Sequence, residues 1–302
     1  MTARMLSAIL LALIVTISSP VVARPPVTLS PSTAWTVDYD DDSCRLTRIF
    51  GDDGDETAFF FERYEPSTSQ FMLVAGRPLR PFRSEDIVQL QFGPAMDAME
   101  ARVRHGDLGR LSPAIMTELE FSVHAGAQNV EELKAAESSK TFAQIDAEDA
   151  ERFAHVDTFA VGLRGNQKLV LRLGDMAEPM AALRDCTREL LTHWGIDVAQ
   201  HETMTRRVAE VSGAKNWLSS VDYPKGALHM GQEGMVQFRL MVDKTGKPTS
   251  CHIQQSTQPK EFDEATCRAM MTRAQFEPAL DANGVPMASY FVKLARFRIV
   301  DR

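Results

Sequence analysis

The sequence predicts an α+β fold in two parts: a strand-rich α+β N-terminal module, then a small C-terminal domain of order β-β-α-β, an antiparallel sheet with one helix. Three observations predict it. Short segments that alternate apolar and polar residues are separated by turn residues, longer amphipathic patterns follow them, and the last 80 or so residues repeat the change from strand to helix to strand. The chain of 302 residues is long enough for two domains.

The first residues predict export. Arg4 is the only charge before an uncharged run from Met5 to Ala23, and small residues end that run. This is typical of a secretory signal peptide, residues 1–23, cleaved after Ala23. The alternative is an inner-membrane anchor formed by residues 5–23. Ser18, Ser19 and Pro20 would interrupt the last turn of such a helix, so we expect cleavage.

The charge is unevenly spread. The formal net charge is −8, yet residues 214–302 carry 12 Lys and Arg against 9 Asp and Glu, so the acidic excess lies in the N-terminal part. No basic stripe of the kind that binds nucleic acid is present, and we expect no nucleic-acid partner.

The N-terminal module is expected over residues 35–197, after an extended, proline-rich lead-in at residues 24–34. Strand patterns come first, at residues 35–40, 44–50, 57–64, 70–76 and 87–93. A hairpin that begins at Ala160 is expected to close around Gly165-Asn166. Helical patterns occupy residues 143–156 and 177–197, and Gly195 is the expected stop signal of the second. Residues 198–220 are polar and predict a short helix plus a linker.

The C-terminal domain is expected over residues 221–302. Val236, Phe238, Leu240 and Val242 alternate with polar residues and Met241, which predicts a half-buried strand. A turn at residues 243–246 leads to a second strand, PTSCHIQQS. A helix with acidic residues in its first turn follows Pro259, as the helix dipole favours, and SYFVKLARFRIV predicts the last strand.

Four cysteines in an exported chain predict two disulfides, and three pairings are open. Cys251 shares a strand face with Ile253, and Cys267 lies on the helix expected to cover that face. These two sulfurs can meet, and closing a loop of roughly 15 residues contributes about 3 kcal/mol. By elimination, Cys44 is expected to pair with Cys186.

No catalytic constellation is apparent, so we expect no enzyme, no catalytic residue and no cofactor. Cys251 and His252 are neighbours in a strand, where successive side chains point to opposite faces, which argues against a thiol–imidazole pair. The seven histidines lack metal-ligand spacing, and we expect no metal site. The acidic GDDGDE at residues 51–56 lacks the glutamate register of a calcium loop and predicts a solvated turn.

The C-terminal segments resemble a known family when taken in order. They are YPKGAL from Tyr223, GQEGMVQFRLMVDKTGKPTSCHI, FDEAT and RAQFEPALDANGVP before the closing strand. Over about residues 215–301 the chain resembles the TonB C-terminal domain family. TonB proteins are energy transducers of the Gram-negative envelope, and they pass inner-membrane energy to outer-membrane receptors for transmembrane transport. Their C-terminal domain binds a short receptor segment, the TonB box, as an added strand.

The resemblance implies a periplasmic protein that binds TonB-box-like partner segments by β-strand addition. It makes the last strand, about Tyr290 to Ile299, the pairing edge. The expected partner-binding residues are Tyr223, Pro224, Tyr290, Val292, Leu294, Arg296 and Arg298. An ordinary core strand is the alternative, since Phe291 and Phe297 would suit a core. The expected partners are proteins, TonB-dependent outer-membrane receptors among them, and a homodimer is an alternative arrangement.

The chain departs from a working transducer in two respects. Its leader looks cleavable, and a folded acidic module stands where a long Pro-rich linker is expected. If the leader is removed, the chain is not anchored in the inner membrane and cannot exert force on a receptor. The alternative function is therefore an envelope structural or assembly factor that acts through its acidic N-terminal module and is not a direct energy transducer.

Overall fold

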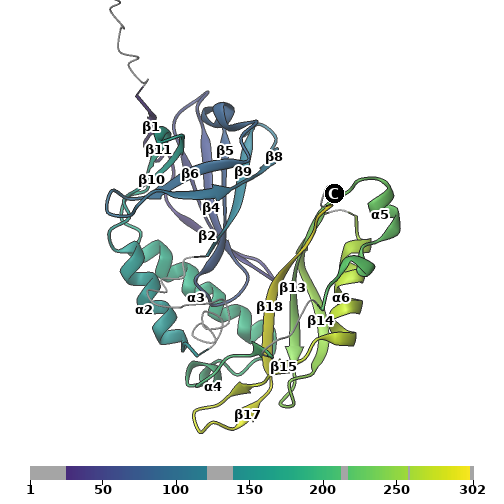
Figure 1. Cartoon of the computed structure of the whole chain (residues 1–302). Helices are drawn as coiled ribbons and strands as arrows, with labels where there is room; N and C mark the ends of the chain where they lie inside the picture. Colours follow the sequence, from purple (N-terminus) through teal and green to yellow (C-terminus); the bar gives the residue numbers. More distant parts are fainter. Residues whose placement is uncertain (1–24, 121–138, 212–216, 258, 300–302) are drawn as a thin grey trace, which may run out of the picture.

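The computed structural model describes residues 25–120, 139–211, 217–257 and 259–299 (Figure 1). It is a mixed α+β structure, which confirms the predicted fold class. The predicted signal peptide and the alternative membrane anchor lie outside the described residues. Within those residues, no helix is long and apolar enough to cross a membrane.

A six-stranded antiparallel sheet forms the larger part of the N-terminal module. In spatial order its strands are β2 (Thr36–Tyr39), β3 (Cys44–Phe50), β4 (Thr57–Arg63), β5 (Ser69–Gly76), β9 (Ala114–Glu120) and β8 (Arg104–Gly106). The first four match the predicted strand segments to within two residues. The short β8 ends this order, and no described strand pairs with its outer side, which we call the open edge of the sheet.

A five-stranded sheet packs against the first one. Its order is β1 (Val27–Leu29), β11 (Asn166–Arg172), β10 (Thr158–Leu163), β6 (Ile87–Phe92) and β7 (Met99–Arg102). The short helix η1 (Arg77–Phe82) connects β5 to β6. Aromatic rings fill the space between the sheets: the ring centroids of Phe59 and Phe159 are 5.0 Å apart, and those of Phe61 and Phe92 are 6.0 Å apart. All four are fully or almost fully buried, and burial of each contributes about 1.5–3 kcal/mol.

The lead-in contains β1, which pairs in parallel with β11, and Leu29 enters the core. One sequence expectation for this module differs from the structure. The hairpin turn is Arg164-Gly165, one residue earlier than expected, since Leu163 pairs with Asn166. Both turn residues have positive φ, 50° and 81°, which is the backbone form that suits the twist of a two-residue hairpin loop.

Among the described residues, the helices of the module are α2 (Phe142–Phe153) and α3 (Ala177–His193), and the short α4 (Val198–Glu202) begins the predicted linker. Thr141 and Gln144 form a reciprocal cap at the start of α2. One face of α3 is buried, and Cys186 on that face is bonded to Cys44 of β3 with an S–S distance of 2.02 Å. Gly195 follows the end of α3 with φ 74°, as expected for a helix stop.

A buried charge network joins β4 to α2 and α3. Arg63 is 1% exposed and Asp149 is fully buried. Arg63 donates two hydrogen bonds to Asp149, from Nη2 at 2.7 Å and Nη1 at 3.3 Å, and Arg184 Nη1 donates a third at 3.0 Å. The Asp149 carboxylate is therefore the junction between the strand and both helices.

The C-terminal domain has the predicted β-β-α-β order. Its main sheet runs β14 (Pro248–Ser256), β13 (Gly234–Val242), β18 (Ser289–Phe297), and α6 (Glu261–Arg273) covers one face. Smaller elements are β12 (Ala209–Glu210), η2 (Ser220–Asp222), α5 (Lys225–His229), β15 (Phe276–Glu277), β16 (Ala279–Leu280) and β17 (Pro286–Met287). Gly246 closes the β13–β14 turn with φ 81°, and a Cβ there would lie 1.9 Å from the Phe276 carbonyl oxygen. Only glycine fits this position.

The predicted alternation of β13 is present, but its polar face is not open to solvent. Val236, Phe238, Leu240 and Val242 point to the α6 core, whereas Gln237 on the other face is also buried. The N-terminal module lies on the side of that second face (Figure 1), and Gln254 of β14 donates hydrogen bonds at 3.2 Å to the main-chain oxygens of Asp42 and Tyr64 of the module.

The module and the C-terminal domain meet through specific contacts. Asp42 accepts hydrogen bonds from Arg239 at 3.3 Å and His252 at 2.7 Å. Tyr290 packs on Trp194 within a small apolar cluster that includes residues of α2 and α3. The predicted linker contributes too, because β12 pairs with β15, and Met204 and Val208 are buried. We conclude that the two parts share an apolar and charged interface.

Candidate functional site

Strand β18 has one paired side and one open side. All nine of its residues pair with β13, from Ser289↔Val242 to Phe297↔Gly234. No other strand among the described residues pairs with it, so it is an edge strand, as the resemblance implied. An edge strand presents a row of unpaired N–H and C=O groups on its outer side, and such a row can pair with another chain.

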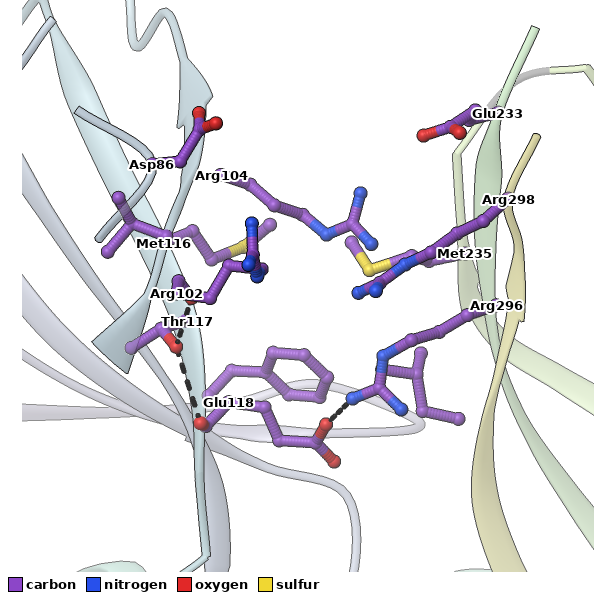
Figure 2. Close-up of a pocket in the computed structure, with 13 residues that line it drawn as sticks. Asp86, Arg102, Arg104, Met116, Thr117, Glu118, Glu233, Met235, Arg296 and Arg298 are labelled. Carbon is purple, nitrogen blue, oxygen red and sulfur yellow. Dashed lines mark hydrogen bonds and ion pairs between the residues drawn. The ribbon is translucent and has the colours of Figure 1, made fainter. Parts of the chain in front are cut away.

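A groove lies between β18 and the open edge of the six-stranded sheet. The larger cleft has a volume of about 680 Å³ and is drawn in Figure 2, and a smaller one of about 190 Å³ continues it toward Val292. The two share Phe71, Glu118, Leu294 and Arg296. One wall comes from the N-terminal module and the other from β13 and β18, so the groove exists only where the two parts meet.

Four arginines line the larger cleft, which we call the arginine groove. Arg102 of β7 and Arg104 of β8 extend from the module, and Arg296 and Arg298 extend from β18 and its C-terminal end (Figure 2). Arg296 forms an ion pair with Glu118 of β9. Within the part of the chain that the structure describes, no acidic side chain pairs with the guanidinium groups of the other three.

The arginines repel one another across the groove. The pKa of Arg296 is lowered by burial and by the positive charges of Arg298 and Arg104. The pKa of Arg104 is lowered by burial and by Arg298, although the Glu233 carboxylate acts in the opposite direction. The positive charges of these arginines are therefore not fully balanced by acidic side chains in this structure, and an anion bound in the groove would balance them.

The acidic side chains of the arginine groove are fewer and partly engaged. They are Asp86, Glu118 and Glu233. Glu118 holds Arg296, and Glu233 Oε1 accepts the main-chain N–H of Ile299 at 2.8 Å. This second bond ties the segment after β18 to the residue that precedes β13, which keeps Arg298 at the mouth of the groove.

The rest of the lining is apolar. Phe71, Met116, Met235 and Leu294 lie between the charged groups, and Met116 and Met235 are labelled in Figure 2. The side chains of Leu294, Arg296 and Arg298 alternate with those of Ala295 and Phe297, which point into the α6 core. One face of β18 thus presents an apolar position followed by two cationic ones.

The structure divides the partner-binding residues expected from the sequence. Leu294, Arg296 and Arg298 come together in the arginine groove. Val292 lines the smaller cleft and packs against the apolar cluster around Tyr290. The Tyr290 side chain is 5% exposed and stacks on His201, so only its main chain can face a partner.

Tyr223 and Pro224 lie elsewhere. The Tyr223 ring packs edge-on against Phe262 and Phe297 in the α6 core, and its hydroxyl donates to the Gln232 carbonyl oxygen at 2.6 Å. Burial raises its pKa. These contacts hold the chain entry to β13 and do not reach the groove side of β18.

The two cysteines of the C-terminal domain serve the fold. Cys251 and Cys267 are bonded with an S–S distance of 1.97 Å, which links β14 to α6. His252 points away from them, as alternation predicts, and reaches Asp42 of the module. Among the described residues, no group of three or more His, Cys, Asp or Glu side chains is arranged to hold a metal ion.

Sequence reasoning missed half of the groove. Arg102 and Arg104 lie on β7 and β8, which were not predicted as strands. The segment EARVRHG does alternate charged residues with Ala101 and Val103, both buried, and that alternation was the available signal. Its position opposite β18 depends on long-range packing.

Residues 219–299 match the family model described as Gram-negative bacterial TonB protein C-terminal. This confirms the resemblance over the last third of the chain, and the match includes the whole of β13, β14, α6 and β18. The N-terminal module lies outside it. A comparison with curated proteins found no match.

Proposed function

We propose that this chain is a periplasmic protein that binds an extended segment of a protein partner by adding it as a strand to β18. Its C-terminal third is a TonB-type domain, and domains of this family act in transport across the Gram-negative envelope. The partners that fit are the TonB-box-like segments of TonB-dependent outer-membrane receptors. The activity is binding, and the chain needs no catalytic group for it.

The open outer side of β18 carries this proposal. It offers nine residues of edge strand, which is longer than the average strand in a globular protein. Natural proteins protect such edges with charge, with proline or by covering them, because an unprotected edge pairs with other chains. Here Lys293 and Arg296 supply charge while the groove leaves space beside the strand. This combination suits a regulated pairing surface.

Both interpretations of the first 23 residues agree with a periplasmic site. A cleaved signal peptide would release the chain into the periplasm, and an N-terminal inner-membrane anchor would hold the C-terminal domain on the same side. Only the anchored form could transmit force from the inner membrane. Mass measurement of the exported protein distinguishes them, because cleavage after Ala23 leaves a chain that starts at Arg24.

Photocrosslinking from β18 tests the proposal. A photoreactive phenylalanine analogue at position 293 places the reactive group on the edge strand and leaves all four groove arginines in place. Lys293 is about half exposed and pairs with Glu210, and an exposed ion pair contributes little to stability. The expected adduct in living cells joins position 293 to an extended segment of an outer-membrane receptor.

The matched control carries the same analogue at position 255. Gln255 is exposed on β14, the opposite edge strand of the same sheet, and should give no receptor adduct. Adducts at position 293 with lipid or with copies of this chain alone would contradict receptor capture. Adducts that form only from positions on the N-terminal module would favour the alternative, an envelope assembly factor acting through that module.

A further inference from the structure

We propose that the arginine groove selects partner segments with two acidic side chains, at positions i and i+2. An apolar side chain follows on the same face, two positions beyond the acidic residue opposite Arg296. This inference rests on the proposed strand addition at β18, because the spacing comes from pairing with that strand. The ligand class is an extended acidic peptide. The N-terminal module takes part in recognition, since it supplies half of the cationic groups.

The spacing follows from strand geometry. Leu294, Arg296 and Arg298 are two residues apart along β18, and all three line the groove. A strand added beside β18 places a residue opposite each of them, with Cβ atoms about 4.5–5.5 Å apart on the shared face. Acidic residues opposite Arg296 and Arg298 therefore occur at i and i+2. The residue opposite Leu294 is two positions farther along, in either chain direction.

The opposite wall completes the site for those carboxylates. Arg102 and Arg104 extend from β7 and β8 toward the arginines of β18, and Figure 2 shows the guanidinium groups of Arg104 and Arg298 turned toward each other. Glu118 already engages Arg296, whereas the other three arginines have no acidic partner among the described residues. Carboxylates of a bound segment would lie between cations from both walls, where charge-assisted hydrogen bonds are strongest.

The apolar lining favours a peptide over a simple anion. Phe71, Met116, Met235 and Leu294 offer no hydrogen-bond donor to a phosphate, but they suit the aliphatic residue of a strand. The open β18 edge adds main-chain pairing, which a free anion cannot use. Charge, apolar contact and backbone pairing thus converge on one kind of occupant.

Fluorescence anisotropy with defined peptides tests the inference on the exported, disulfide-bonded protein. The probe is a labelled seven-residue peptide with the pattern Glu-x-Glu-x-Val-x-Val, in which x is serine or threonine. A second probe carries the same residues in reverse order, for a segment that runs in the other direction along β18. The comparator of each probe carries Gln in place of both Glu residues. We expect the Glu peptide to bind about tenfold more tightly, because two partly exposed charge pairs are gained. The Arg104→Gln/Arg298→Gln variant should reduce that preference, and Arg172→Gln, an exposed arginine of β11 outside the groove, should keep it.

Two N-methylated versions of the Glu peptide separate acid selection from strand addition. Each is methylated on one alternate set of amides, and only one set can face β18 in a paired strand. Loss of binding for one version alone supports strand addition. Equal affinity of the Glu and Gln peptides for the unmodified protein would overturn the acid preference, whatever the methylated peptides do.

The remaining outcomes are also decisive. A Glu preference with full binding of both methylated versions would overturn the proposed strand addition and leave the carboxylate preference standing. If none of the unmethylated peptides binds at concentrations up to about 1 mM, both the acid preference and the strand addition are overturned. The comparison of Glu with Gln uses the unmodified protein, so it does not depend on whether a variant folds.

Discussion

Neutralising the buried Asp149 should destabilise the N-terminal module more than any surface charge change. Asp149→Asn keeps the size of the side chain and removes its charge. Arg63 would then face a neutral amide in place of the carboxylate, and the other polar side chain that it contacts is Gln70, which accepts from Nε at 3.0 Å. Arg184 would lose its 3.0 Å ion pair as well.

The expected loss follows from the geometry of this network. Removal of one partner from a buried ion pair costs about 3–5 kcal/mol, because the remaining charge stays desolvated. Arg63 and Asp149 have 1% and 0% exposed side chains, so solvent cannot replace the lost contact. Total folding free energies are only about 5–15 kcal/mol, and the variant should therefore be close to unfolding at 37 °C.

Urea denaturation followed by circular dichroism measures the change in unfolding free energy. Glu148→Gln is the matched control on the same helix, since the Glu148 side chain is 37% exposed and its ion pair with Lys140 is partly open to solvent. It should cost less than about 1 kcal/mol. The double replacement Arg63→Leu/Asp149→Leu should be milder than Asp149→Asn, because it removes the fully buried Arg63 charge together with its partner and leaves only the less buried Arg184 without its 3.0 Å contact. A loss below about 1 kcal/mol for Asp149→Asn would refute the reasoning.

Non-reducing peptide mapping of the exported protein should recover the two disulfides of the structure, and a peptide that joins Cys44 to a C-terminal cysteine would contradict this pairing. Burial lowers the pKa of His201, so the unfolded chain binds more protons than the native chain as the pH falls below about 6.5. The urea midpoint should therefore fall more between about pH 7.5 and pH 5.5 for the unmodified protein than for His201→Gln, and equal falls would exclude His201 as the cause. Asp42→Asn should lower the unfolding free energy by about 1–3 kcal/mol, because it weakens hydrogen bonds to two basic side chains of the sheet, and an equal effect of the exposed neighbour Asp41→Asn would argue against this contact.

Local patterns were sufficient for most of the secondary structure. Strands β3 and β14 begin and end at the predicted residues, because alternation and flanking turn residues mark them. Helix α3 begins at the predicted residue, Ala177. The turn at Arg164-Gly165 was misplaced by one residue, since Gly165-Asn166 is also a good turn pair and only the strand register distinguishes them.

The candidate site was predicted only in part. The family resemblance predicted that β18 is an edge strand, and it predicted Arg296 and Arg298 as partner-binding residues. The opposite wall could not be inferred, because β7 and β8 alternate charged with small apolar residues and carry weak strand signals. Burial of Tyr290 was missed for a related reason: its covering residues, Trp194 and His201, lie about 90 positions earlier and reach it only through the tertiary fold.

The division of the groove between two parts of the chain bears on fragments of this protein. Glu118 and Arg296 touch across 178 positions of sequence, and one wall of the groove lies wholly outside the region that the family match covers. An excised C-terminal domain would keep the β18 edge but would expose Gln237 and Tyr290, which the module now covers. Such a fragment would combine a bare pairing edge with newly exposed surface, and would tend to self-associate. Partner screens that use this fragment would detect non-specific association in place of specific binding. The full mature chain is the appropriate bait.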